Sequence, residues 1–148
     1  MIDELDRKIL RELEADGRIS NTELAKRVGL SASACLRRVQ GLEEAGIIQG
    51  YRAVLDRSKL GAGFIAYVAV QLSKHTKEDQ QRFEDHMKAV PQVLECHNTT
   101  GTIEYLLRVE VEDLTSYKQF HTEVLGTVPG VAGITSYIVM ESPINRRG

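Results

Sequence analysis

Residues 24–48 read LAKRVGLSASACLRRVQGLEEAGII, and this stretch determines the architecture of the N-terminal part of the chain. Gly29 suits the end of one helix, because glycine readily adopts the left-handed conformation that follows a last turn. Ser31 suits the start of the next helix, because its hydroxyl can accept a hydrogen bond from a free backbone N–H group. Two helices joined by so few residues are typical of a helix-turn-helix, whose second helix enters the major groove of DNA.

The residues before this stretch predict one more helix and the start of the second. Asp3 can cap a first helix whose apolar stripe recurs at every fourth position, as Leu5, Ile9 and Leu13. Gly17 then offers a left-handed stop. The tetrapeptide at 20–23, Ser-Asn-Thr-Glu, predicts a capping box in which Ser20 and Glu23 bind each other's backbone N–H groups.

The third helix has two different faces. A helical wheel places an apolar face toward the interior, formed by Cys35, Leu36, Val39 and Leu42. The opposite side carries residue types that suit base edges, since arginine can bind guanine, glutamine adenine and serine either. The predicted DNA-binding residues are Ser31, Ser33, Ala34, Arg37, Arg38 and Gln40, with Lys26 and Arg27 from the preceding helix. The alternative interpretation of these residues is an ordinary solvated helix face.

The charge distribution favours the DNA interpretation although the net charge is only −2. Residues 17–42 hold five basic side chains and one acid, a balance of +4, whereas residues 61–148 hold eight basic and eleven acidic side chains, a balance of −3. A basic segment in a nearly neutral chain indicates a localised contact with a polyanion.

Composition excludes several classes of protein. The chain has 148 residues, 42% of them hydrophobic, and no run approaches the roughly 18 apolar residues of a membrane span. The acidic, helical N-terminus does not resemble a secretory signal, so a cytoplasmic location is expected. Cys35 and Cys96 lack metal-ligand spacing and are interpreted as small buried residues. No metal, cofactor or membrane partner is therefore expected.

The C-terminal residues predict an α+β domain. Strands are expected at 64–72, 93–100, 103–111 and 131–140, with one helix from the Thr76 cap to Pro91 and another from the Asp113 cap to about Gly126. The order βαββαβ is the ferredoxin-like arrangement. Residues 47–55 predict a strand that leaves the helical unit, with Arg52 near the DNA backbone, and residues 56–62 predict a linker. The expected domains are therefore residues 1–60 and 61–148.

The first strand of this domain is apolar on both sides. Ile65, Tyr67 and Ala69 alternate with an equally apolar set, although two helices can cover only one face of a four-stranded sheet. The uncovered face predicts contact with a second subunit across a twofold axis, which also suits a protein that reads two DNA half-sites.

Taken together, these segments resemble the Lrp/AsnC (leucine-responsive/asparagine-regulator) family of bacterial and archaeal transcription factors. The resemblance covers nearly the whole chain and is carried by residues 5–56, by TGTIEYLLRVEV at 100–111 and by VPGVAGITSYIVME at 128–141. It implies a C-terminal domain that dimerises, commonly builds octamers and binds amino acids between subunits near the glycine loop. The family more often has Asp where this chain has Glu104.

The loop around Gly101 has suitable chemistry for an amino acid. Its hydroxyls can bind a carboxylate, Gly101 lets a ligand approach the backbone, and Glu104 can neutralise an ammonium group from the partner-facing side of its strand. The predicted effector residues are Thr99, Thr100, Gly101, Thr102, Ile103, Glu104 and Ser136. The alternative interpretation is a plain hairpin turn with a surface glutamate.

An enzyme of the same architecture is the alternative function, since siroheme decarboxylases also resemble this family. They use histidines and arginines on a tetrapyrrole. The four histidines at 75, 86, 97 and 121 form no spaced metal or catalytic motif, so no catalytic or metal residues are predicted.

Overall fold

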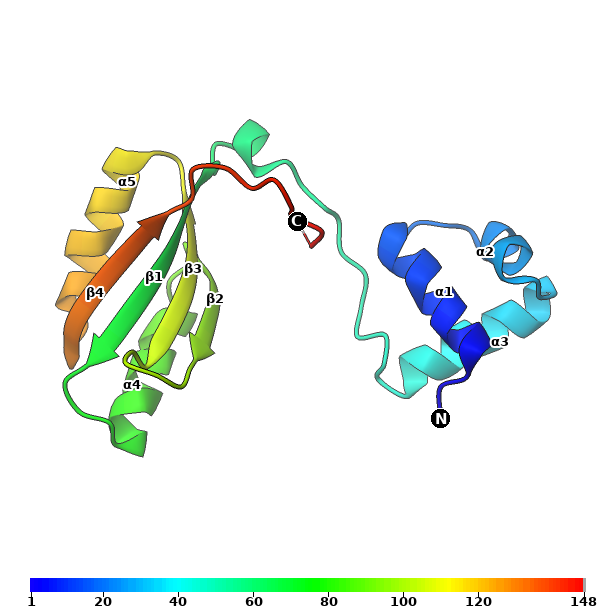
Figure 1. Cartoon of the computed structure of the whole chain (residues 1–148), viewed down its shortest axis with the longest axis horizontal. Coiled ribbons are helices and arrows are strands. Elements are labelled where there is room, and N and C mark those ends of the chain that lie inside the picture. The colour runs from blue at the N-terminus through cyan, green and yellow to red at the C-terminus, as the bar shows by residue number, and fades with distance from the viewer. Residues whose placement is uncertain (148) are drawn as a thin grey trace. The chain divides into compact units, whose positions relative to one another are not determined.

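The computed structural model describes residues 1–147, and Gly148, the last residue of the expected second domain, lies outside the described residues. The chain divides into two compact units, one formed by residues 1–54 and the other beginning at Leu55 (Figure 1). Each unit has its own hydrophobic core.

The first unit contains three helices, α1 at Glu4–Ala15, α2 at Asn21–Val28 and α3 at Ala32–Glu44. Their starts are capped by Asp3, Ser20 and Ser31, as the sequence predicts. Burial of apolar side chains from all three helices stabilises the unit, because each helix is too short to persist alone in water. The buried core consists of Ile9, Leu24, Ala25, Val28, Cys35 and Leu42.

The helix ends differ in part from the predictions. Gly29 ends α2 with a φ of 76°, as predicted, but Gly17 has no positive φ and α1 ends through the extended residue Asp16. The capping box at Ser20 is half formed, because the carboxylate of Glu23 accepts a hydrogen bond from Arg27 instead. The helical wheel places Leu36 in the core, but its side chain is 45% exposed.

The segment between the two units forms less regular structure than predicted. Residues 49–56 adopt no helix or strand, so the expected strand at 47–55 is wrong. Ile48 packs against the core of the first unit, which explains its apolar character without a sheet. Within the predicted linker, the short 3-10 helix η1 occupies Arg57–Leu60 and ends at Gly61 with a φ of 73°.

The second unit has the predicted βαββαβ order. Its strands are β1 at Phe64–Leu72, β2 at Val93–Asn98, β3 at Tyr105–Val111 and β4 at Val131–Ile138. Helix α4 spans Lys77–Lys88; α5 spans Leu114–Gln119 and continues as the turns η2 at Phe120–Val124 and η3 at Leu125–Thr127. The antiparallel sheet has the order β2-β3-β1-β4, so β2 and β4 are its edges.

Both helices cover the same face of this sheet (Figure 1). Phe83 and Met87 of α4 and Tyr117 of α5 pack on Val68 and Leu107, which lie opposite each other on β1 and β3. Neighbouring strand residues point to opposite faces, so Ile65, Tyr67, Leu106, Arg108 and Glu110 lie on the second face.

Some element boundaries are shorter than predicted. Strand β2 ends at Asn98 and β3 begins at Tyr105, because residues 99–104 form a turn of their own. Strand β4 ends at Ile138, two residues before the predicted end. At the start of α5 Leu114 is 64% exposed, whereas Tyr117 and Phe120 further along are buried.

Candidate functional sites

The outward side of α3 presents an exposed polar stripe. Ser33, Arg37 and Gln40 are exposed, and among residues 1–147 Arg37 has no ion-pair partner. The start of the helix is fixed from two sides. The Ser31 hydroxyl accepts from the Ala34 N–H at 3.2 Å, and the Asn21 amide of α2 donates to the Ala32 carbonyl at 2.8 Å. The stripe therefore lies on a helix whose start is fixed by hydrogen bonds, and its positively charged side chain, Arg37, is available to bind a ligand.

Arg38, unlike the adjacent Arg37, forms ion pairs within the helical unit. Its Nη1 lies 2.7 Å from Asp3 Oδ2 and 3.1 Å from Asp6 Oδ1, at the start of α1. The hydrogen bond to Asp3 is the main cause that raises the pKa of Arg38. The guanidinium of Arg38 therefore joins α3 to α1, and its predicted role at DNA stays a prediction.

Arg27 is engaged in the same way. Its guanidinium bonds Glu12 of α1 at 3.0 Å and Glu23 of its own helix at 3.2 Å, and these bonds raise the pKa of Arg27. Lys26 is exposed and, in the part of the chain that the structure describes, has no such partner. Sequence periodicity could not reveal these pairs, since residues from different helices form them.

The loop between β2 and β3 contains most of the predicted effector residues. The Thr99 N–H donates to the Glu104 carbonyl at 2.9 Å, and the Thr99 hydroxyl donates to the Ile103 carbonyl at 3.4 Å. Between these anchors, Thr100, Gly101 and Thr102 are exposed. Gly101 has a φ of 113°, which L side chains rarely adopt, and no atom lies within 4 Å of the position that a Cβ would occupy there. The loop tip is therefore open to a ligand.

Glu104 anchors this loop to the β1–α4 connection of its own chain. Its Oε2 accepts from the Leu72 N–H at 2.7 Å, and its Oε1 lies 2.6 Å from His75 Nδ1. The side chain is only 12% exposed. Within its own chain the carboxylate is engaged by these two contacts, and its predicted orientation toward a partner subunit stays a prediction. The sequence does not indicate His75 at this site, because 29 positions separate it from Glu104.

Ser136 lies apart from the loop. It sits on β4 opposite Val68 of β1, so β1 separates it from β3. Its hydroxyl shares a hydrogen bond with the Tyr117 hydroxyl on the face covered by helices. The structure therefore does not bring Ser136 together with Thr99–Glu104 within one chain.

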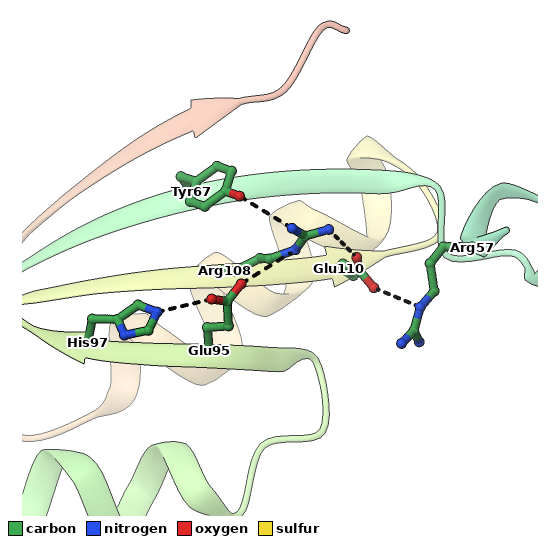
Figure 2. Close-up of polar contacts among 6 residues, drawn as sticks. All are labelled: Arg57, Tyr67, Glu95, His97, Arg108 and Glu110. Carbon is green, nitrogen blue, oxygen red and sulfur yellow. Dashed lines mark hydrogen bonds and ion pairs between the residues drawn. The ribbon is translucent and has the colours of Figure 1, made fainter. Parts of the chain in front are cut away.

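A chain of ion pairs crosses the second face of the sheet (Figure 2). Arg108 of β3 bonds Glu110 at 3.0 Å, approaches Glu95 of β2 at 3.8 Å and donates to the Tyr67 hydroxyl of β1 at 3.4 Å. Burial opposes the charge of Arg108, but the bonds to Glu110 and Tyr67 outweigh it and raise its pKa.

Two further polar contacts extend these interactions beyond the central strands. His97 Nε2 lies 3.1 Å from Glu95 Oε1, and Arg57 of η1 places its Nε 3.6 Å from Glu110 Oε2 (Figure 2). The Glu110 side chain is only 3% exposed, and its Oε2 has no hydrogen bond. Sequence alternation places these charges on one face, but only the strand register brings them into contact.

A cavity of about 320 Å³ opens between α4 and the edge strand β2, lined in part by Met87, Cys96 and Tyr105. The sequence predicts two buried cysteines, but Cys96 is exposed and only Cys35 is buried. Partial enclosure, with a smaller effect of Glu84, still raises the pKa of the Cys96 thiol to about 11. Within residues 1–147 no three His, Cys, Asp or Glu side chains are grouped to hold a metal ion, and no helix is long and apolar enough to span a membrane.

Two family models match the chain, one for each unit. Residues 2–49 match a winged helix-turn-helix DNA-binding domain, and residues 65–148 match the Lrp/AsnC ligand binding domain. Among curated proteins, the Bkd operon transcriptional regulator of Pseudomonas aeruginosa is 46% identical over 145 residues, which cover 98% of this chain and 95% of that protein. The leucine-responsive regulatory protein of Escherichia coli is 41% identical over 95% of this chain and 85% of its own length.

Solved structures give the same result. A transcriptional regulator from Neisseria meningitidis, in complex with L-Met, has a TM-score of 0.94 and 34% identity, covering 98% of this chain and 94% of its own. The feast or famine regulatory protein from M. tuberculosis, complexed with L-methionine, has a TM-score of 0.85 and 31% identity, covering 100% of this chain and 98% of its own.

Proposed function

The chain belongs to the Lrp/AsnC family of transcriptional regulators, and from this premise we propose that α3 reads operator DNA while the β2–β3 loop binds a free amino acid. As a regulator of this family it has a helix-turn-helix DNA-binding domain and an effector-binding domain. Its proposed place of action is the cytoplasm, where the DNA of bacteria and archaea lies.

One observation supports the DNA assignment most strongly, namely the exposed stripe of Ser33, Arg37 and Gln40 on a helix whose start is hydrogen-bonded in place. Arg37 is free to bind a guanine edge, and Gln40 to bind adenine. Ser31 and Ala34 are small enough for the helix start to approach a phosphate. Lys26 adds a free charge for the backbone, whereas Arg27 and Arg38 are already paired.

Binding of the full chain to DNA tests this assignment. A duplex selected from a random-sequence pool should bind more tightly than the unselected pool, as measured by fluorescence anisotropy. Because phosphate contacts release counterions, log affinity should fall linearly with log salt concentration, with a slope near −0.9 for each phosphate neutralised. Failure to enrich any sequence would contradict sequence-specific reading by α3.

The open tip of the β2–β3 loop supports the effector assignment. A free amino acid carries one carboxylate and one ammonium group. Thr100 and Thr102 offer hydroxyls, and the backbone at Gly101 is accessible, so the tip suits the carboxylate. Glu104 holds the loop in place and supplies a negative charge beside it for the ammonium. The complexes of two relatives with L-methionine favour this ligand class.

A thermal-shift screen of the full chain against the twenty amino acids tests the ligand class. An amino acid present at 100 times its Kd should stabilise the folded protein by roughly 2.7 kcal/mol. If no amino acid shifts the melting temperature, the effector assignment is wrong, and the DNA assignment is unaffected.

The second face of the sheet supports assembly into dimers, and the family resemblance favours octamers. Both helices leave this face uncovered, and Tyr67 and Tyr137 lie opposite each other there, 36% and 59% exposed. A twofold axis through this face would bury both rings. Light scattering on the full chain measures the assembly directly, and a folded monomer at all concentrations would contradict it. No catalytic role is proposed, since no observation favours a decarboxylase over a regulator.

A further inference from the structure

Leu36 is an apolar residue on the polar side of α3. Its side chain is 45% exposed, whereas Cys35 beside it is fully buried and Leu42 is 4% exposed. An exposed leucine on its own needs no explanation. The position of Leu36 on α3, beside the proposed DNA-reading residues, points to a specific role for this leucine.

Leu36 shares a helix face with the proposed DNA-reading residues. Positions 33, 36, 37 and 40 are separated by three and four residues, the spacing that brings side chains together on one face. Ser33, Arg37 and Gln40 are exposed, and Leu36 is nearly half exposed among them. Arg38, in contrast, faces the start of α1, where it is bound by Asp3 and Asp6. The outward stripe of α3 therefore consists of three polar side chains and the apolar side chain of Leu36.

We infer that Leu36 is a specificity-determining residue that packs against the methyl group of a thymine in the operator, an inference that rests on the proposed function of α3. The thymine methyl is the apolar group that the major groove presents, and apolar side chains are its usual partners. Ser33 and Gln40 read hydrogen-bonding groups, and Arg37 adds charge. Leu36 alone on this stripe gains by excluding water from a methyl group.

The size of the effect follows from the loss of one methyl contact. Burial of one such carbon contributes about 0.8 kcal/mol, which corresponds to about a fourfold change in Kd. Replacement of the contacted thymine by deoxyuridine removes only that methyl and keeps both hydrogen-bonding groups. This replacement should weaken binding of the wild-type protein about fourfold at the contacted thymine.

The decisive experiment combines the two changes. The full chain first selects a duplex from a random-sequence pool, and each thymine of that duplex is then replaced singly by deoxyuridine. Binding of wild type, Leu36→Ala and Leu36→Met is measured by fluorescence anisotropy. With Leu36→Ala the deoxyuridine penalty should disappear at the contacted position, whereas Leu36→Met, which keeps the apolar bulk, should retain most of it.

Two controls separate this inference from the function on which it rests. Leu60→Ala removes another exposed leucine, 63% exposed on η1, and should leave every penalty unchanged. Arg37→Ala should weaken the selected duplex whatever Leu36 does. If Arg37→Ala weakens binding but the deoxyuridine penalties are the same in wild type and Leu36→Ala, the role of Leu36 is wrong and α3 still reads DNA. If Leu36→Ala weakens all duplexes equally and alters the oligomer size, Leu36 contacts another copy of the chain, which also overturns the inference. If no duplex is selected, both assignments fail together.

Discussion

The outward stripe of α3 and the second face of the sheet use arginine in opposite ways. On α3, Arg37 is exposed and has no ion-pair partner among the described residues. On the sheet, Arg108 is 14% exposed and contacts Glu110, Glu95 and Tyr67. A charged side chain that binds a polyanion can remain solvated until the polyanion arrives. A charged side chain that another protein surface covers must already be paired, because an unpaired buried charge is very costly. The difference is consistent with the proposed roles of the two surfaces, DNA binding for the α3 stripe and contact with a second subunit for the sheet face.

The largest expected effect is the loss of stability of the sheet unit when Arg108 is removed. Arg108→Ala should lower the free energy of unfolding of the sheet unit by about 3–5 kcal/mol, because it leaves Glu110, only 3% exposed, with Arg57 as its remaining partner. Thermal unfolding followed by circular dichroism measures the change. Arg82→Ala, which removes an arginine that is 56% exposed and pairs with Asp79, is the matched control and should change stability by less than about 1 kcal/mol.

A double replacement separates two possible causes of this loss. If the cost of Arg108→Ala is that of a stranded charge, the combined change Arg108→Met with Glu110→Leu should recover most of the lost stability. A double variant as unstable as Arg108→Ala would mean that the ion pairs themselves, and not the stranded glutamate, stabilise the sheet.

The second-largest expected effect tests whether amino-acid binding at the loop depends on the Glu104 carboxylate. Glu104→Ala removes the acceptor for the Leu72 N–H and the partner of His75, so the loop loses its anchor as well as its charge. Amino-acid affinity measured by calorimetry should fall by about 1.5–3 kcal/mol, the usual contribution of a hydrogen bond to a charged group. Glu112→Ala, an exposed glutamate after β3, is the control. Equal affinities in the two variants would place the effector elsewhere.

The contrast between the adjacent arginines of α3 gives the third prediction. Arg37→Ala should weaken operator binding by about 1–3 kcal/mol with little change in melting temperature, because the side chain has no partner among the described residues of its unit. Arg38→Ala should do the reverse, lowering the melting temperature of the helical unit while operator affinity changes less, because its partners are Asp3 and Asp6. If Arg38→Ala costs more operator affinity than Arg37→Ala, the assignment of a free and a paired arginine to different tasks is wrong.

The smallest expected effect is a change in the melting temperature of the helical unit at acidic pH. The hydrogen bond from the Asp6 N–H, followed by that from Arg38, lowers the pKa of Asp3 below its ordinary 3.8. A carboxyl with a lowered pKa in the folded state stabilises the protein above 3.8, and this contribution is lost as the pH falls through the folded-state value. The melting temperature should therefore decline in that acidic range, and Asp3→Asn should make the decline shallower. Identical profiles for the two proteins would show that Asp3 makes no such contribution.

Features that depend on local chemistry could be predicted well from the sequence. Ser31, Gly29 and Thr76 mark helix boundaries because caps and left-handed glycines act on their immediate neighbours. The βαββαβ order and the helix-covered face followed from periodicity along each element. The family resemblance, which the matched models confirm, covered both units.

The contacts between elements could not be predicted in the same way. Nothing local indicates that Arg38 pairs with Asp3, which lies 35 positions away, or that the Ser136 hydroxyl faces Tyr117. Leu36 was misplaced because a helical wheel assigns a leucine near the core side to the core. The short helices of this unit bury only Cys35 and Leu42 from α3, and Val39 is partly buried. The chain of charges beside Arg108 depends on a register shift in β2 between Val93 and Glu95.

The difference between the two cysteines makes the native chain a ready substrate for single-site labelling. Cys35 is inaccessible in the core of the helical unit, and Cys96 is exposed beside the cavity between α4 and β2. A maleimide dye should therefore attach to one position without any cysteine being removed. Because the thiol pKa is raised to about 11, the reactive thiolate is scarce near neutral pH, and coupling should accelerate as the pH rises toward that value. A dye placed there reports on the edge of the sheet from within an unmutated regulator.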